Sequence, residues 1–319
     1  MSKDKILVIG ANGQIGSVLT EALRSNFGTD NVLATDIRAV EGHDGPFEIL
    51  NVSDAKSLAD VVSRHGITQI YHLAAILSAR GEQNPLQTWD FNMGGLFNVF
   101  EVAREKEISK IFFPSSIAVF GADIPRQMTP QNAVLKPTTV YGMSKSAGEL
   151  WSQYYFQKFG LDVRSLRYPG VIGWQSNPGG GTTDYAVDIY HYAVKDEDYT
   201  CFLSENTALP MIYMDDAIRA TLELMDAAAS DLKVRTSYNL AGMSFSPKEI
   251  TASIQKLKPD FKVSYQPDFR QKIADSWPES IDDTSARTDW NWQPKFDLDA
   301  MTQDMVSHLE EKYRLVGTV

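Results

Sequence analysis

Short apolar runs, each long enough for one buried strand, recur through the first half of the chain. They lie at residues 6–9, 32–35, 47–50, 69–75, 110–116 and 163–168. Between them apolar residues repeat at helical spacing, most clearly in residues 86–104 and 140–159. Strands that alternate with helices of this length predict an α/β fold, built on a doubly wound parallel sheet with right-handed crossovers.

This rhythm breaks after Gly173, where a glycine-rich loop at residues 174–184 leads into less regular segments. We expect helices at residues 185–194, 215–225, 247–257 and 299–313, and strands at residues 211–213, 238–241 and 262–266. The pattern predicts a core at residues 1–173 and a smaller, mainly substrate-binding lobe at residues 174–319. The segments around residues 211–241 are expected to return to the core sheet.

The first strand runs into a glycine turn that opens a helix. Gly10, Gly13 and Gly16 stand at three-residue spacing, and glycines there allow a pyrophosphate to approach the backbone N–H groups of the helix N-terminus. Asp36 ends the second strand twenty residues after Gly16, where an acid can bind a ribose 2′-hydroxyl. The pattern predicts a Rossmann-type dinucleotide site, although a glycine loop that only turns the chain would share the spacing.

The same region predicts NAD as the cofactor. Asp36 would repel the 2′-phosphate of NADP, whereas Arg38 could soften that repulsion. Small residues at the carboxyl end of the fourth strand suit a ligand that lies across the edge of the sheet. Besides the three glycines and Asp36, the predicted cofactor contacts here are Asn12, Gln14, Ile15, Ile37, Arg38, Leu73, Ala74 and Ala75.

Composition narrows the possible functions. The 319 residues carry a formal net charge of −11, which opposes nonspecific binding to nucleic acid or to an anionic membrane. Cys201 is the one cysteine, so we expect neither an intrachain disulfide nor a bound metal. No apolar stretch approaches the roughly 20 residues that span a bilayer. The first strand also starts too near Met1 for a signal peptide, so we expect a cytoplasmic protein.

Tyr141 and Lys145 are the strongest candidates for chemistry. Their four-residue spacing near the start of a helix puts both on one face, where the ammonium would favour the phenolate. Such a pair suits removal of a proton from an alcohol while hydride leaves the same carbon. Ser115 and Ser116 end the fifth strand, where a hydroxyl could bond the substrate oxygen. Exposed Tyr/Lys pairs and turn-capping serines are common, so spacing alone does not decide these roles.

Four motifs in this order resemble the extended short-chain dehydrogenase/reductase family: GANGQIG, HLAA, PSSIAVFG and YGMSK. Weaker similarity follows at residues 213–217 and 286–294. The resemblance implies that Ser116 is catalytic, that Tyr141 is the general base, and that Lys145 binds the ribose and activates the base. Phe120 stands where the family's motif usually has tyrosine. Further cofactor contacts implied by the resemblance are Asn51 (in place of the usual aspartate), Val52, Asn92, Tyr168 and Ile172.

Within that family, several segments resemble the bacterial short-chain L-threonine 3-dehydrogenases. They are residues 74–82, 114–121, 177–190 and 276–287. The resemblance implies oxidation of the threonine β-hydroxyl to 2-amino-3-ketobutyrate, with hydride transfer to NAD. Two alternatives stay open: Thr182 and Thr183 could belong to an ordinary surface loop, and Trp277 could be a packing residue. The implied substrate contacts are Ser78, Ser116, Tyr141, Gly180, Thr182, Thr183 and Trp277.

Two other functions fit part of the pattern. A nucleotide-sugar epimerase or dehydratase uses the same Ser, Tyr and Lys but needs cations for a diphosphate, and only Lys195 supplies one between Gly173 and Pro210. An NAD(H)-sensing binding protein would commonly lack Tyr or Lys of the pair. We expect a small-molecule substrate as partner and, by analogy with the family, a homodimer formed through residues 86–104 and 140–159.

Overall fold

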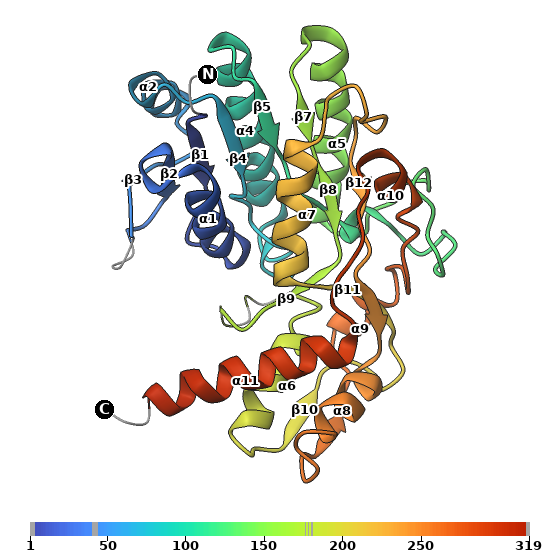
Figure 1. Ribbon diagram of the computed structural model, residues 1–319. Helices are drawn as coiled ribbons and strands as arrows, with labels where there is room; N and C mark the ends of the chain where they lie inside the picture. The colour runs from blue at the N-terminus through green and yellow to red at the C-terminus, as the bar shows by residue number, and fades with distance from the viewer. Residues whose placement is uncertain (1–3, 40–43, 176, 178, 180, 317–319) are drawn as a thin grey trace. The chain divides into compact units, whose positions relative to one another are not determined.

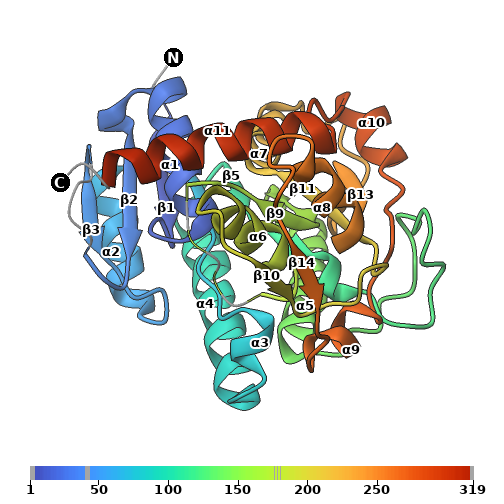
Figure 2. The ribbon, with the colours of Figure 1, turned by 90° about the horizontal axis from the view of Figure 1, so that it is seen from below.

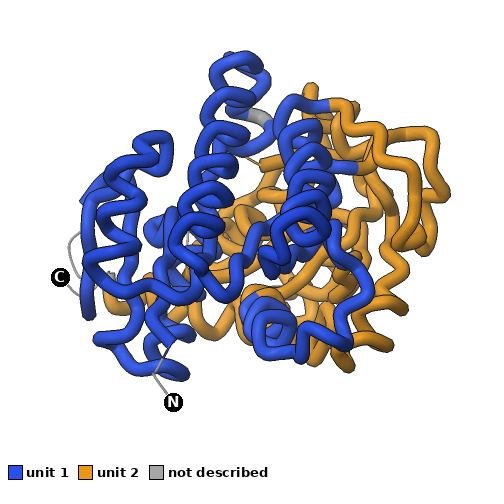
Figure 3. Tube along the Cα trace, turned by 90° about the horizontal axis from the view of Figure 1, so that it is seen from above, with its two compact units in different colours: residues 1–119, 139–167, 218–238 blue, residues 120–138, 168–217, 239–319 orange. Residues whose placement is uncertain are grey.

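The computed structural model describes residues 4–39, 44–175, 177, 179 and 181–316. The chain forms two compact units, each assembled from three stretches of sequence (Figure 3). Unit 1 comprises residues 1–119, 139–167 and 218–238, and unit 2 comprises residues 120–138, 168–217 and 239–319. Residues 120–138 lie in unit 2 and residues 218–238 in unit 1, so neither unit is one continuous stretch of the chain.

Unit 1 is built around a six-stranded sheet with the order β3-β2-β1-β4-β5-β7 (Figure 1). Every neighbouring pair in it is parallel. The strand order reverses between β1 and β4, and a doubly wound sheet binds its ligand at the carboxyl ends beside such a reversal. The predicted α/β fold with a doubly wound parallel sheet is thus confirmed. The strands are β1 (Ile6–Ile9), β2 (Val32–Asp36), β3 (Phe47–Ile49), β4 (Gln69–His72), β5 (Lys110–Phe112) and β7 (Val163–Arg164).

Local sequence signals begin and end the helices of unit 1. Asp54 caps α2 (Ala55–His65) by accepting two backbone N–H bonds, and Gly66 ends the helix in the left-handed region. Thr139 caps α5 (Val140–Phe159) by accepting the Gly142 N–H, and Gly160 ends it in the left-handed region, so the predicted bounds of this helix are confirmed. The unit also holds α1 (Gln14–Phe27), the short α3 (Ser78–Gly81) and α4 (Pro85–Glu105).

The apolar sides of these elements share one core. Leu7 and Ile70 from the sheet, Leu58 from α2 and Val99 from α4 are all fully buried in it. The residues that recur at helical spacing in the sequence are therefore the ones that face the sheet. This core holds the strand ends, and the loops that follow them, in fixed positions.

Two of the predicted strands are each split. Residues 110–116 form β5 and β6 (Ser115–Ser116), which are separated at Pro114, because proline has no N–H to donate to a ladder. Residues 163–168 form β7 and β8 (Leu166–Tyr168). β6 and β8 leave the six-stranded sheet and join β12 (Tyr238–Asn239) in the order β12-β8-β6. Ser116 therefore lies in a two-residue strand next to β8.

Unit 2 contains two small sheets. β11 (Leu209–Tyr213) pairs in parallel with β9 (Gly170–Ile172) and antiparallel with β13 (Met243–Phe245). β10 (Tyr199–Cys201) pairs in parallel with β14 (Val263–Tyr265). Three helices of this unit pack against one another (Figure 2), namely α6 (Tyr185–Val194), α8 (Pro247–Gln255) and α11 (Leu298–Val316). The short α9 (Arg270–Ala274) and α10 (Thr284–Trp290) complete it.

The segments expected to return to the core sheet pair elsewhere. β11 belongs to the sheet of unit 2, and β12 joins β8 rather than the six strands. α7 (Met214–Asp226) follows β11 directly, so it begins one residue before the expected range and Asp215 lies in its first turn. Ser246 caps α8 and forms a capping box with Glu249. Among the helices that the structure describes, none is both long and apolar enough to cross a membrane.

Candidate active site

The glycine turn between β1 and α1 leaves no room for side chains at two of its three glycines. Gly10 has a φ of +87°, and a Cβ built on it would lie 2.7 Å from the Ala74 nitrogen. A Cβ on Gly16 would lie 2.1 Å from the Gly10 carbonyl oxygen. Gly13 is the N-cap of α1 and offers no side chain to the N–H groups of the first turn. N–H groups at a helix N-terminus of this kind can bind an anion such as a pyrophosphate.

Asp36 is hydrogen-bonded to this turn. Its Oδ2 accepts the Asn12 backbone N–H at 3.1 Å, and its Oδ1 accepts the Ile37 N–H at 2.8 Å. The Asn12 side chain in turn donates to the Arg38 carbonyl oxygen at 2.7 Å. A cradle that a Cβ would fill, next to a fixed carboxylate, fits a dinucleotide whose adenosine ribose reaches Asp36.

The other predicted cofactor residues lie mainly at the ends of the same strands. Leu73, Ala74 and Ala75 follow β4, and the Leu73 N–H donates to the Ile9 carbonyl oxygen at 2.8 Å. Asn51 follows β3 and accepts the Ser53 N–H through its side chain at 3.0 Å. The rest are distributed as follows: Gln14 and Ile15 open α1, Val52 is buried next to Asn51, and Tyr168 and Ile172 are buried in β8 and β9 of unit 2.

Asn92, on α4, acts as a structural clamp. Its Oδ1 accepts the Ile76 N–H at 2.8 Å, and its Nδ2 donates to the Ile76 carbonyl oxygen at 3.1 Å. Nδ2 also contacts the Ser144 hydroxyl of α5 at 3.2 Å. The Asn92 amide thereby joins the loop after β4 to both α4 and α5.

Ser116, Tyr141 and Lys145 come together in unit 1. The Ser116 side chain hydrogen-bonds Tyr141, and its Oγ also accepts the Ala118 N–H at 3.2 Å. Lys145 is 4% exposed, and its Nζ lies 5.6 Å from the centre of the Tyr141 ring and 4.5 Å from that of Phe113. The predicted serine, tyrosine and lysine therefore form one cluster.

Burial dominates the protonation of this cluster. It raises the pKa of Tyr141 to about 12, although the Ser116 hydrogen bond acts in the opposite direction. It also lowers the pKa of Lys145 to about 7. His72, at the end of β4, has its pKa lowered to about 3 by burial and then by the charge of Lys145. The lowered tyrosine pKa expected from the sequence is therefore not found, because desolvation outweighs the Ser116 hydrogen bond.

The predicted substrate residues are distributed over both units. Ser78 begins α3 in unit 1 and is 5% exposed. Thr182 and Trp277, both in unit 2, are buried, and neither Thr182 Oγ1 nor Trp277 Nε1 has a hydrogen-bond partner among the described residues. Thr183 lies against Gly170, because a Cβ built on Gly170 would lie 2.8 Å from the Cβ of Thr183. Gly180 lies outside the residues that the structure describes.

A buried ion pair that the sequence analysis missed adjoins the cluster. Arg167 of β8 donates from Nε and Nη2 to the two carboxylate oxygens of Glu149, at 2.9 and 2.8 Å. The Ser115 hydroxyl donates to Glu149 Oε1 at 2.6 Å. Glu149 continues the row of Tyr141 and Lys145 at four-residue spacing along α5, and this periodicity was the signal that could have identified it.

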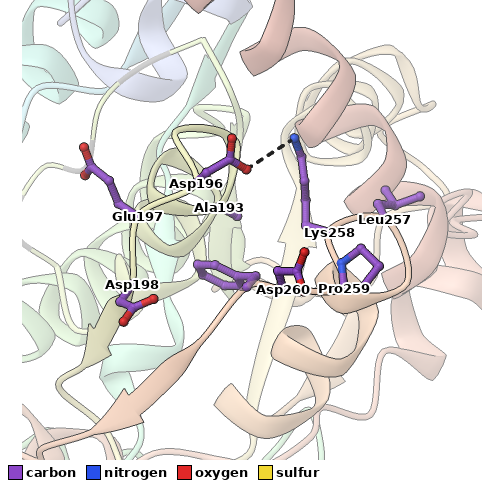
Figure 4. Close-up of a pocket in the computed structure, with 9 residues that line it drawn as sticks. Ala193, Asp196, Glu197, Asp198, Leu257, Lys258, Pro259 and Asp260 are labelled. Atoms are coloured by element: carbon purple, nitrogen blue, oxygen red, sulfur yellow. Dashed lines mark ion pairs between the residues drawn. The ribbon is translucent and has the colours of Figure 1, made fainter.

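A surface pocket of about 170 Å³ in unit 2 contains none of the predicted site residues (Figure 4). Its walls carry the carboxylates of Asp196, Glu197, Asp198 and Asp260 together with Lys258. The ammonium of Lys258 already pairs with Glu310 at 2.6 Å and lies 3.9 Å from Asp196. This pocket is therefore distinct from the cluster around Tyr141.

Several known proteins resemble the whole chain. An uncharacterized epimerase/dehydratase of Staphylococcus haemolyticus is 49% identical over 314 residues, which cover 97% of this chain and 98% of that protein. The structure of a partial consensus L-threonine 3-dehydrogenase matches with a TM-score of 0.95 and 56% identity. The holo form of a GalE-like L-threonine dehydrogenase from Cupriavidus necator matches with a TM-score of 0.95 and 54% identity. Each of these two matches covers 96% of this chain and 99% of the other chain. A monomeric L-threonine 3-dehydrogenase from a metagenome has a TM-score of 0.94 and 49% identity, with the same coverage.

The sequence profile of the NAD dependent epimerase/dehydratase family matches residues 6–241. This range includes the glycine turn, Asp36 and the Ser116, Tyr141 and Lys145 cluster. Because the profile spans most of the chain and the turn fits a dinucleotide, the protein belongs to the NAD-dependent epimerase/dehydratase family and uses NAD as its cofactor.

Proposed function

We propose that this enzyme is a dehydrogenase that oxidises the β-hydroxyl of L-threonine to 2-amino-3-ketobutyrate. The observation that carries the proposal is its likeness, over nearly the whole chain, to proteins described as L-threonine 3-dehydrogenases. That likeness continues beyond residue 241, where the family profile ends, into the region of Trp277. It therefore supports the choice of substrate in addition to the cofactor.

In the proposed reaction Tyr141 is the general base. Its oxygen takes the proton of the substrate hydroxyl while hydride leaves the same carbon, and bound NAD supplies the hydride acceptor. Ser116 holds the substrate oxygen next to the tyrosine to which it is hydrogen-bonded. Because burial raises the pKa of Tyr141, its phenolate needs both the Ser116 hydrogen bond and the ammonium of Lys145 for stabilisation. The family resemblance adds contact of Lys145 with the cofactor ribose.

We propose Ser78, Thr182, Thr183 and Trp277 as contacts of the substrate. A buried polar group without a hydrogen-bond partner is costly, and both the Thr182 hydroxyl and the Trp277 indole N–H are such groups within the described chain. A polar ligand that accepted hydrogen bonds from these two groups would remove the free-energy cost of leaving them unpaired. Gly181, directly before Thr182, is held by the Asp184 carboxylate, which accepts its N–H at 2.7 Å.

Loss of either threonine hydroxyl tests the substrate. Thr182→Ala and Thr183→Ala are expected to lower kcat/KM for L-threonine by roughly ten- to a hundredfold at one position or both, since a hydrogen bond to a charged group contributes about 1.5–3 kcal/mol. Affinity for NAD should not change. Steady-state NAD reduction and equilibrium NAD binding measure the two effects.

Thr251→Ala is the matched control for these variants. This threonine is buried in unit 2 as well, but its hydroxyl donates to the Pro247 carbonyl of its own helix. Normal threonine oxidation by both site variants would contradict the proposal. So would a rise in the melting temperature of the NAD complex with UDP-glucose and not with L-threonine, an outcome that would favour the epimerase.

One contact favours the amino acid over a nucleotide sugar. Lys195, the cation that the sequence provides between Gly173 and Pro210, lies with its Nζ 4.7 Å above the Tyr313 ring. A cation–π contact of this kind engages the ammonium within unit 2. It is therefore a poor candidate for binding the diphosphate that an epimerase substrate would bring.

The cofactor preference is expected to be NAD over NADP. The Asp36 carboxylate, held by Asn12 and Ile37, would repel a 2′-phosphate. Measured kcat/KM should therefore be lower with NADP, and Asp36→Asn should narrow the difference by removing the charge and keeping the shape. Equal or better kcat/KM of the wild type with NADP would refute this assignment.

We also propose a homodimer that forms through α4 and α5. Leu86 and Trp89 on α4, and Leu150, Trp151 and Tyr154 on α5, are large side chains left exposed in unit 1. Contiguous exposed apolar surface is typical of protein interfaces. Light scattering should give about twice the monomer mass of 35.6 kDa, and a monomer mass at working concentration would contradict the dimer.

A further inference from the structure

We infer that Glu149 is a positioning residue: through Ser115 it fixes strand β6, and with it Ser116, against the helix that carries Tyr141 and Lys145. The inference rests on the proposed function, in which Ser116 and Tyr141 act on the substrate. It assigns a role in catalysis to a carboxylate that contacts neither the substrate nor the cofactor in the proposed mechanism.

Three elements meet at the Glu149 carboxylate. Glu149 comes from α5, Ser115 from β6 and Arg167 from β8, and their exposed fractions are 0%, 1% and 4%. Ser115 donates to Oε1, while Arg167 binds both carboxylate oxygens in a two-pronged arrangement. Every bond in the bridge is charge-assisted and directional, so the bridge fixes distance and orientation together.

The bridge compensates for the weakness of β6 as a strand. β6 has two residues and follows Pro114, which donates no backbone hydrogen bond. Both of its residues reach the same helix, because Ser115 bonds Glu149 and Ser116 bonds Tyr141. A loss of the first contact would therefore loosen the second.

A role in positioning explains why a buried ion pair stands here. Burying two charges contributes little net stability, and apolar side chains of similar size often serve as well or better. A fully bonded pair does, however, select one geometry where apolar packing would tolerate several. Catalytic groups need that selection, since misplacement by about 1 Å can lower a rate on the order of a hundredfold.

Ser115→Ala is the variant that tests the inference. It removes the bond to β6 and leaves the Glu149 and Arg167 pair intact, so no buried charge loses its partner. We expect kcat about ten- to a hundredfold below wild type, with little change in KM or in NAD affinity. The matched control is Ser152→Ala, which removes a buried α5 hydroxyl that donates to the Gly148 carbonyl of its own helix. The control should keep wild-type kcat at a similar melting temperature.

The pH profile separates positioning from a loss of stability. Among the described residues, the titratable groups around Tyr141 are Lys145 on its own helix and, next to Lys145, His72 of β4, which burial keeps neutral. The Ser116 hydrogen bond lowers the pKa of Tyr141 against the effect of burial. If Ser115→Ala loosens Ser116, the pKa of Tyr141 rises, and the ascending limb of kcat against pH moves to higher pH. A purely structural role would lower the melting temperature without moving that limb.

Titration of Tyr141 by NMR provides a readout that does not depend on the substrate. With tyrosine labelled at 13Cζ, the Tyr141 resonance is the one missing from Tyr141→Phe. It should titrate at higher pH in Ser115→Ala than in wild type and Ser152→Ala. Equal titration curves, or equal kcat and pH profiles for the two serine variants, would overturn the inference. A wild type that does not oxidise L-threonine would overturn the proposed function instead, and the NMR comparison would still decide on Glu149.

Discussion

Replacement of Tyr141 by phenylalanine is expected to lower kcat for L-threonine oxidation by about 10²- to 10⁴-fold, the usual loss for a positioned acid–base group. The variant removes the hydroxyl that Ser116 bonds and keeps the ring near which Lys145 lies. NAD binding should change little, because the glycine turn and Asp36 are untouched. Steady-state NAD reduction gives kcat, and quenching of protein fluorescence by NAD gives the dissociation constant.

Tyr155→Phe is the matched control on the same helix. Its ring is buried, and its hydroxyl donates to the Glu101 carboxylate at 2.5 Å, a contact outside the cluster. This control should retain wild-type kcat. If Tyr141→Phe also kept near-wild-type kcat, Tyr141 would not be the base.

Lys145→Met is expected to lower kcat/KM by at least about a hundredfold, while it makes the protein without cofactor more stable. The activity falls because the phenolate of Tyr141 loses its nearby ammonium and the cofactor loses a donor. The stability rises because the wild type must bury the Lys145 ammonium. Burial disfavours this charged form and lowers its pKa to about 7, and the methionine variant avoids that cost. Methionine fills a similar length without a charge.

The gain in stability has a defined pH dependence. Below pH 7 both folded and unfolded chains hold the Lys145 proton, and the cost of burying it is fully present. As the pH rises toward 10.5 the folded state releases that proton and the cost disappears. A fall in pKa from 10.5 to about 7 corresponds to at most about 5 kcal/mol of unfolding free energy. Urea unfolding of both proteins at pH 6, 8 and 10 measures the difference.

Lys110→Met serves as the control for this pair of effects. Lys110 also lies in unit 1, but its Nζ donates to the Met225 carbonyl oxygen at 2.8 Å. Its replacement should cost a hydrogen bond and leave activity unchanged. A Lys145→Met variant that is no more stable than wild type at pH 6 would show that Lys145 is not desolvated as described.

Local signals in the sequence located most elements of the fold well. The bounds of α5 and α6 match the expected ranges, because Gly160 ends one helix and a polar loop precedes the other. The strands near Pro114 and Ser165 were merged in the prediction, since an apolar run does not reveal where a strand changes sheets. The place of residues 120–138 in unit 2 depends on contacts between distant segments, which periodicity does not encode.

In the candidate site, too, local sequence signals revealed some residues, while contacts between distant segments decided others. The Gly10 to Gly16 turn and Asp36 were visible because covalent spacing alone puts a strand, a turn and a helix in order. Tyr141 and Lys145 share a helical face for the same reason. Glu149 was missed although it lies on that face, because its partner Arg167 is eighteen residues away and belongs to another element.

The sequence by itself determined the order of strands and helices, the cofactor turn and the row of polar residues on α5, because each depends on neighbours within a few positions. Only the tertiary structure decided how these groups are protonated and held. Burial raises the pKa of Tyr141 and lowers that of Lys145, and the fold joins Ser115, Glu149 and Arg167 from three elements. Desolvation and hydrogen bonds between distant residues exist only once the chain has packed, which is why no local pattern carries them.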